Sequence, residues 1–75
     1  MQIYIKDVSG YDNAPIMLAK PKVKDDLLLS CKIAFSEFNS EIDNDYCLYS
    51  VWECETIDEI QEVLEENEFI FELRE

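Results

Sequence analysis

The two ends of the chain carry the residue patterns of β-strands. Residues 2–8 are rich in β-branched and aromatic side chains, and their alternation places Ile3 and Ile5 on one face. Residues 69–74 are again rich in aromatic and branched side chains. We therefore expect a strand at each end of the chain.

Two internal segments also favour strands. Residues 9–13 collect turn formers around the only glycine, so we expect the chain to reverse there and to return as a short strand at 15–20. Pro15 and Pro21 restrict that strand to the edge of a sheet. Residues 46–52 are rich in tyrosine, valine and tryptophan, which predicts a central strand.

The hydrophobic spacing becomes helical from about Asp25 to Phe38. Asp25 and Asp26 suit the positive N-terminal end of such a helix. Leu29 and Ile33 lie opposite its core-facing stripe and form a second apolar spot, either covered by the N-terminal hairpin or used for self-association. The core-facing stripe consists of Leu27, Leu28, Cys31, Ala34, Phe35 and Phe38.

A second helix is marked by the spacing of Thr56 and Glu59. This spacing is that of a capping box, in which a hydroxyl and a carboxylate satisfy unpaired backbone N–H groups at a helix start. Asn67 is a candidate for the left-handed residue that ends the helix. The buried stripe of this helix consists of Ile57, Ile60, Val63 and Leu64.

These elements predict a single α+β domain over residues 1–75, in the order β(β)αβαβ with a polar connection at 39–45. The architecture expected is a two-layer sandwich, with both helices on one face of a three- or four-stranded sheet. Hydrophobic residues make up 48% of the chain, too many for a disordered acidic tail. A chain of this length buries only about 60% of its unfolded surface, so its stability margin is small.

The cysteine content and the hydropathy indicate a cytoplasmic location, in a cell or in an infected host cell. No apolar run approaches the length of a membrane span, and the first seven residues lack the pattern of a signal peptide. Cys31, Cys47 and Cys54 are odd in number and have no CxxC spacing, which fits reduced thiols that act as small buried hydrophobes.

The net charge of −12 is concentrated in the second half of the chain. Residues 1–36 hold five lysines and four aspartates, whereas residues 37–75 hold fourteen carboxylates and the single cation Arg74, a balance of −13. The polar face of the expected second helix has no lysine or arginine. Its like-charged pairs at i, i+3 and i, i+4 together destabilise the helix by about 1–2 kcal/mol.

Solubility is one explanation for this acidity. Another is that a positively charged partner relieves the repulsion. Carboxylates one helical turn apart are separated by about 5.4 Å, and those two apart on a strand by about 6.6 Å, of the same order as phosphate spacing. The candidate partner-binding residues are Glu53, Glu55, Asp58, Glu59, Glu62, Glu65, Glu66 and Tyr49.

We therefore expect an acidic inhibitor or regulator that blocks the basic site of a nucleic-acid-processing protein. It would be a nucleic-acid mimic, of the kind that phages encode against host nucleases and defence systems. The aromatic residues beside the acidic tract are explained first by core packing, and the tyrosines are the better interface candidates. The alternative function is a structural subunit that forms a homo-oligomer, such as a homodimer, through Leu29 and Ile33 or through a sheet edge.

Other functions find little support in the residues. The chain has no histidine, a single glycine and no phosphate-binding loop, which argues against an enzyme and against a cofactor. Glu41, Asp43 and Asp45 alternate like the start of a calcium loop, but Tyr46 and Trp52 stand where its glycine and glutamate belong. No metal site is expected. The acidity opposes direct binding to nucleic acid, and no membrane partner is expected.

Overall fold

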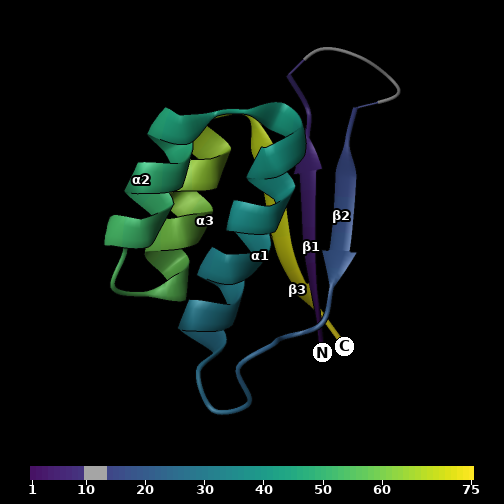
Figure 1. The fold of residues 1–75 in the computed structure, drawn as a ribbon, viewed down its shortest axis with the longest axis vertical. Helices are drawn as coiled ribbons and strands as arrows, with labels where there is room; N and C mark the ends of the chain where they lie inside the picture. The colour runs from purple at the N-terminus through teal and green to yellow at the C-terminus, as the bar shows by residue number, and fades with distance from the viewer. Residues whose placement is uncertain (10–13) are drawn as a thin grey trace.

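The computed structural model describes residues 1–9 and 14–75, which form a three-stranded antiparallel sheet with three helices on one face (Figure 1). The predicted α+β fold is thus confirmed, with a third helix, α2, that packs on α1 and α3. In chain order, the elements are β1 (Gln2–Asp7), β2 (Ile16–Ala19), α1 (Leu27–Ile42), α2 (Asp45–Glu53), α3 (Ile57–Glu66) and β3 (Phe69–Arg74).

The first strand is the centre of the sheet, because the strand order is β2-β1-β3. Ile3 pairs with Ala19 and Leu73, and Ile5 pairs with Met17 and Phe71, so these side chains share the face covered by the helices. The short strand β2 lies at an edge, as its two flanking prolines predict. The reversal predicted at 9–13 falls mainly on residues 10–13, outside the described residues.

The prediction of a central strand at residues 46–52 is wrong, because this segment forms the helix α2. The Asn44 side chain accepts a hydrogen bond from the backbone N–H of Cys47 at 3.2 Å and caps the helix. Cys47, Val51 and Cys54 follow each other at four and three residues, and all three are buried. A helix brings this triad to one face, which a strand cannot do.

The first helix begins close to its predicted start, with Asp26 as its cap, and runs past its predicted end. The Asp26 side chain accepts a hydrogen bond from the N–H of Leu29 at 2.9 Å. Four further residues of the predicted polar connection continue the helix to Ile42, and Asp43 then adopts a left-handed conformation with φ of 55°. The side chain of buried Asn39 holds the turn, since its oxygen accepts from the N–H of Asn44 at 2.7 Å.

The predicted capping box forms at α3 with one change of partner. The Thr56 hydroxyl accepts from the N–H of Glu59 at 3.2 Å, whereas the Glu59 carboxylate accepts from the N–H of Glu55 at 3.4 Å and not from Thr56. The left-handed residue after the helix is Glu68, with φ of 66°, and not Asn67. Asn67 instead donates its side-chain amide to the carbonyl of Val63 at 2.8 Å.

The core lies between the sheet and the helices. Phe35 and Phe38 of α1 and Phe69 of β3 are buried and meet edge to face, with ring centroids 5.5 to 6.2 Å apart. Ile3 and Ile5 complete the central layer from β1. In the described part of the chain, no helix combines the length and the hydropathy needed to cross a bilayer.

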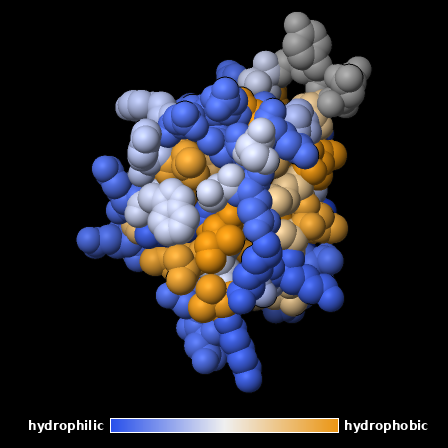
Figure 2. All heavy atoms as spheres, in the orientation of Figure 1, coloured by the Kyte–Doolittle hydropathy of each residue, from blue (hydrophilic) through white to orange (hydrophobic). Residues whose placement is uncertain are grey.

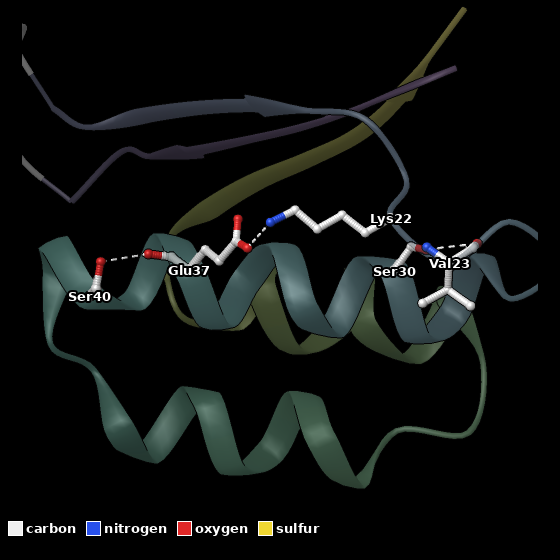
Figure 3. A network of polar contacts seen from close by, with 5 residues as sticks. All are labelled: Lys22, Val23, Ser30, Glu37 and Ser40. Atoms are coloured by element: carbon white, nitrogen blue, oxygen red, sulfur yellow. Dashed lines mark hydrogen bonds and ion pairs between the residues drawn. The ribbon is translucent and has the colours of Figure 1, made fainter.

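Hydrogen bonds and an ion pair hold the lysine-rich connection between β2 and α1 against α1 (Figure 3). The buried Ser30 hydroxyl accepts from the N–H of Val23 at 2.9 Å and donates to its carbonyl at 3.1 Å. Lys22 forms an ion pair with Glu37 of α1. This lysine therefore neutralises a carboxylate of the first helix.

Candidate functional site

A groove with acidic walls lies between α2 and α3. It is open to the surface and has a volume of about 360 Å³. Its lining combines four glutamates with three small or apolar residues: Glu53, Glu59, Glu62, Glu66, Ser50, Cys54 and Val63. We call this set of residues the acidic groove.

Helical spacing brings three of the glutamates together on α3. Glu59, Glu62 and Glu66 are separated by three and four residues, so they follow one side of the helix at rises of about 4.5 and 6 Å. Glu53 comes from the last turn of α2 and reaches the same groove from the opposite wall. The packing of α2 on α3 therefore adds a fourth carboxylate from a different helix.

The acidic groove has no ion pair within the described part of the chain, and the nearby cation Lys32 of α1 donates instead to the carbonyl of Trp52 at the end of α2, at 3.0 Å. The ion pairs among residues 1–9 and 14–75 are Lys22 with Glu37 and Arg74 with Glu72, and neither involves a groove residue. The last turns of α2 and α3 contain acidic residues and no basic ones, which is the unfavourable sign at the negative end of a helix. The groove thus gathers four carboxylates without an ion-pair partner in the described part of the chain.

Glu59 differs from the other groove glutamates because it also has a structural part. Its carboxylate accepts the hydrogen bond from the N–H of Glu55 and closes the cap of α3. Glu62 and Glu66 make no such hydrogen bond within the described residues and are exposed. They are therefore the positions at which the charge of the groove can be changed without disturbing the helix cap.

The floor of the groove holds a protonated thiol. Cys54 is buried, and its Sγ donates to the carbonyl of Ser50 at 3.2 Å. Burial raises the pKa of this thiol, the Glu59 carboxylate raises it further, and Lys32 opposes the shift. A raised pKa disfavours the thiolate form of Cys54.

Three members of the predicted acidic row lie outside the groove. Asp58 and Glu65 are exposed on the polar face of α3 but do not line the groove, and Glu65 accepts from the side chain of Gln61 at 3.2 Å. Glu55 lies in the connection between α2 and α3. The strand spacing predicted for Glu53 and Glu55 does not apply, because Glu53 ends a helix.

The aromatic residues of α2 face solvent. Tyr46 and Tyr49 are 78% and 71% exposed and Trp52 is 41% exposed, whereas Phe69 and Phe71 are in the core. The expectation that Tyr46, Tyr49 and Trp52 pack in the core is wrong, because it depended on a strand at residues 46–52. The helix α2 instead exposes these three side chains. Tyr49 and Glu53 are four residues apart on α2, so an exposed aromatic ring stands beside the groove.

Leu29 and Ile33 lie on the outward side of α1, away from the core cluster. Both side chains are partly buried, and neither packs with the buried hydrophobic cluster. Their predicted part in self-association stays a prediction.

The remaining acidic residues show no arrangement that would hold a metal. Within residues 1–9 and 14–75, no group of three or more cysteine or carboxylate side chains is placed for coordination. Asp43 and Asp45 belong to the turn between α1 and α2, where Asp45 accepts from the Asn39 amide at 3.1 Å. Their alternation in sequence reflects a helix end followed by a helix start.

Comparisons with models of protein families, with curated proteins and with solved structures found no match.

Proposed function

We propose that this protein is a small acidic inhibitor or regulator that binds a basic surface of another protein through the acidic groove. The observation that carries the proposal is the placement of Glu53, Glu59, Glu62 and Glu66 around one groove without an intramolecular ion pair in the described residues. Like charges held together cost stability. A cationic partner would recover that cost and would be attracted from a distance at low salt.

The basic surface that fits the acidic groove best is one that normally binds nucleic acid. Along α3 the groove carboxylates recur at about 4.5 to 6 Å, and a nucleic-acid strand presents one phosphate charge per about 3.4 Å of rise. The rows are comparable in spacing and equal in sign, so arginines and lysines arranged for phosphates can pair with the carboxylates. The protein would then act as a nucleic-acid mimic, of the kind that phages direct against host defence systems.

Exposed Tyr49 supplies a second kind of contact beside the charges. Tyrosine is frequent among the residues that dominate binding energy at interfaces, and its ring can accept an arginine by a cation–π interaction. The proposed site is thus an acidic groove with an aromatic rim. Binding at this site requires no catalytic group. The buried, reduced cysteines favour a cytoplasmic location.

The proposal is tested with a pair of variants that change charge equally. Glu62→Lys with Glu66→Lys reverses two charges in the groove and spares the capping residue Glu59. Asp25→Lys with Glu41→Lys makes the same change in net charge at exposed positions outside the groove. Each protein is immobilised, exposed to a host-cell lysate at low salt, washed with salt, and the released proteins are identified.

We expect partners that the wild-type protein and the control variant retain and that the groove variant loses. A purified partner should release a fluorescent DNA or RNA duplex when the wild-type protein is added. Equal capture by all three proteins would show that only net charge matters. Partners that keep their nucleic acid bound would refute the mimic while leaving protein binding intact.

A third double variant, Asp58→Lys with Glu65→Lys, separates the groove from the longer acidic row. Both positions are on α3 but lie outside the groove lining. If the groove alone is the contact, this variant binds nearly as well as the wild-type protein. A loss equal to that of the groove variant would show that the whole polar face of α3 takes part.

A further inference from the structure

The face of the sheet that points away from the helices is not covered by any described element (Figure 1). Because Ile3 and Ile5 point toward the helices, the alternate positions of each strand point outward. These outward positions are Gln2, Tyr4, Lys6, Ile16, Leu18, Ile70, Glu72 and Arg74. We call them the outer sheet face.

Aliphatic side chains are prominent on the outer sheet face. Ile16 and Leu18 of β2 are 56% and 54% exposed, and Ile70 of β3 is also exposed. The register places Leu18 beside Tyr4, and it places Lys6 between Ile16 and Ile70. Figure 2 shows hydrophobic residues reaching the surface along β2. A sheet face that is exposed to solvent would normally carry polar residues at these positions.

The outer sheet face is nearly neutral in a strongly acidic molecule. Arg74 lies over the ring of Tyr4 at 3.7 Å and pairs with Glu72 at 2.9 Å. Lys6 adds the other cation, so two cations and one carboxylate give this face a charge of +1, against −12 for the chain. Two copies can bring these faces together without opposing their acidic surfaces.

We propose that a second copy of this chain covers the outer sheet face, forming a two-fold symmetric dimer with the two sheets packed face to face. Stacked sheets lie about 10 Å apart and interdigitate their side chains. The same patch then serves both partners, as a two-fold interface requires. Leu18, Ile16 and Ile70 are the residues that lose most contact with water.

Electrostatics favours this arrangement over contacts through the helices. Two copies joined by their sheets carry their helical faces on the outside, separated by more than the 20 Å shortest dimension of one molecule. The Debye length is about 8 Å at physiological salt, so repulsion between the two acidic grooves is largely screened. A contact through α1, where Leu29 and Ile33 lie, would bring the acidic helices of both copies closer. The inference does not rest on the proposed function.

Sedimentation velocity at micromolar concentration tests the dimer, with Leu18→Glu as the interface variant and Ile33→Glu as its matched control. Both variants replace an aliphatic residue by glutamate and add one negative charge. We expect a wild-type dimer that tightens as salt is raised, that Ile33→Glu preserves, and whose dissociation constant Leu18→Glu raises by about tenfold or more. Leu18 is largely exposed on an edge strand, so the folded monomer should tolerate the change.

Several results would overturn the proposal. A wild-type monomer at all concentrations, a dimer that high salt dissociates, or a dimer broken only by Ile33→Glu each contradict it. A dimer that Leu18→Glu leaves intact would point to pairing of the sheet edges instead. If Leu18→Glu does not fold, Leu18→Ser truncates the same contact without adding charge and is judged by the same criteria.

Discussion

Neutralising Glu62 should stabilise the fold while weakening the proposed interface. Within α3, Glu62 is three or four residues from Asp58, Glu59, Glu65 and Glu66, so it takes part in four like-charged pairs. Each pair costs about 0.2–0.5 kcal/mol, and the four together cost about 0.8–2 kcal/mol. Glu62 is exposed, and the described residues offer it neither an ion pair nor a hydrogen bond that the substitution would break.

We expect Glu62→Gln to raise the free energy of unfolding by about 1 kcal/mol at low salt. For a domain of this size, that gain corresponds to a rise in Tm of about 4–8 °C. Circular dichroism followed through thermal and urea unfolding at pH 7 gives both values. Glu41→Gln on α1 makes the same chemical change away from the groove and should shift stability by less than about 0.5 kcal/mol.

Salt separates charge repulsion from other causes. Exposed charges are screened at high ionic strength, so the gain of Glu62→Gln should shrink markedly in high salt. A gain that is unchanged by salt, or a loss of stability at low salt, would refute the reasoning. A variant that is more stable and yet binds a captured partner less well would be the signature of repulsion retained for binding.

Three further predictions concern the fold. Thr56→Ala should cost about 1 kcal/mol in urea unfolding through loss of the α3 cap, and Thr56→Ser should restore it; equal stability of both would contradict the cap. Ser30→Ala leaves the N–H of Val23 without its partner and removes one of the two donors to its carbonyl, and it should cost about 1–3 kcal/mol, with faster hydrogen exchange of the Val23 amide as the specific readout. Burial raises the pKa of Cys31 and Cys47 from 9.0 to about 11, so these thiols stay protonated in the folded state while those of the unfolded chain ionise. Stability present below pH 9 should therefore fall as the pH rises toward 11, by up to about 2–3 kcal/mol per thiol. A flat urea midpoint across that range would exclude this linkage.

Local signals in the sequence were sufficient for most of the elements. The alternation around Ile3 and Ile5 predicts β1, and two flanking prolines predict that β2 is at an edge. The capping box at Thr56 predicts the start of α3, and the charges of Asp25 and Asp26 indicate the start of α1. Each of these signals acts between residues close in sequence, so it can be recognised before the fold is known.

The segment 46–52 shows where such signals conflict. Its tyrosines, valine and tryptophan favour a strand, because β-propensity reflects how side chains pack on a pleated surface. The Asn44 cap and the spacing of Cys47 and Val51 favour a helix, and packing against α1 and α3 decides the outcome. Correct weighting of the cap would have predicted both the helix and the exposed tyrosines.

The sequence by itself determined the uneven charge, the acidic side of α3 and the α+β class, because these follow from composition and from periodicity along one element. Only the tertiary structure decided which carboxylates share a site. It joined Glu53 of α2 to the row on α3, excluded Asp58 and Glu65, and left one sheet face uncovered. These outcomes depend on the rotation of packed helices and on strand order, which are set by contacts between residues far apart in the chain.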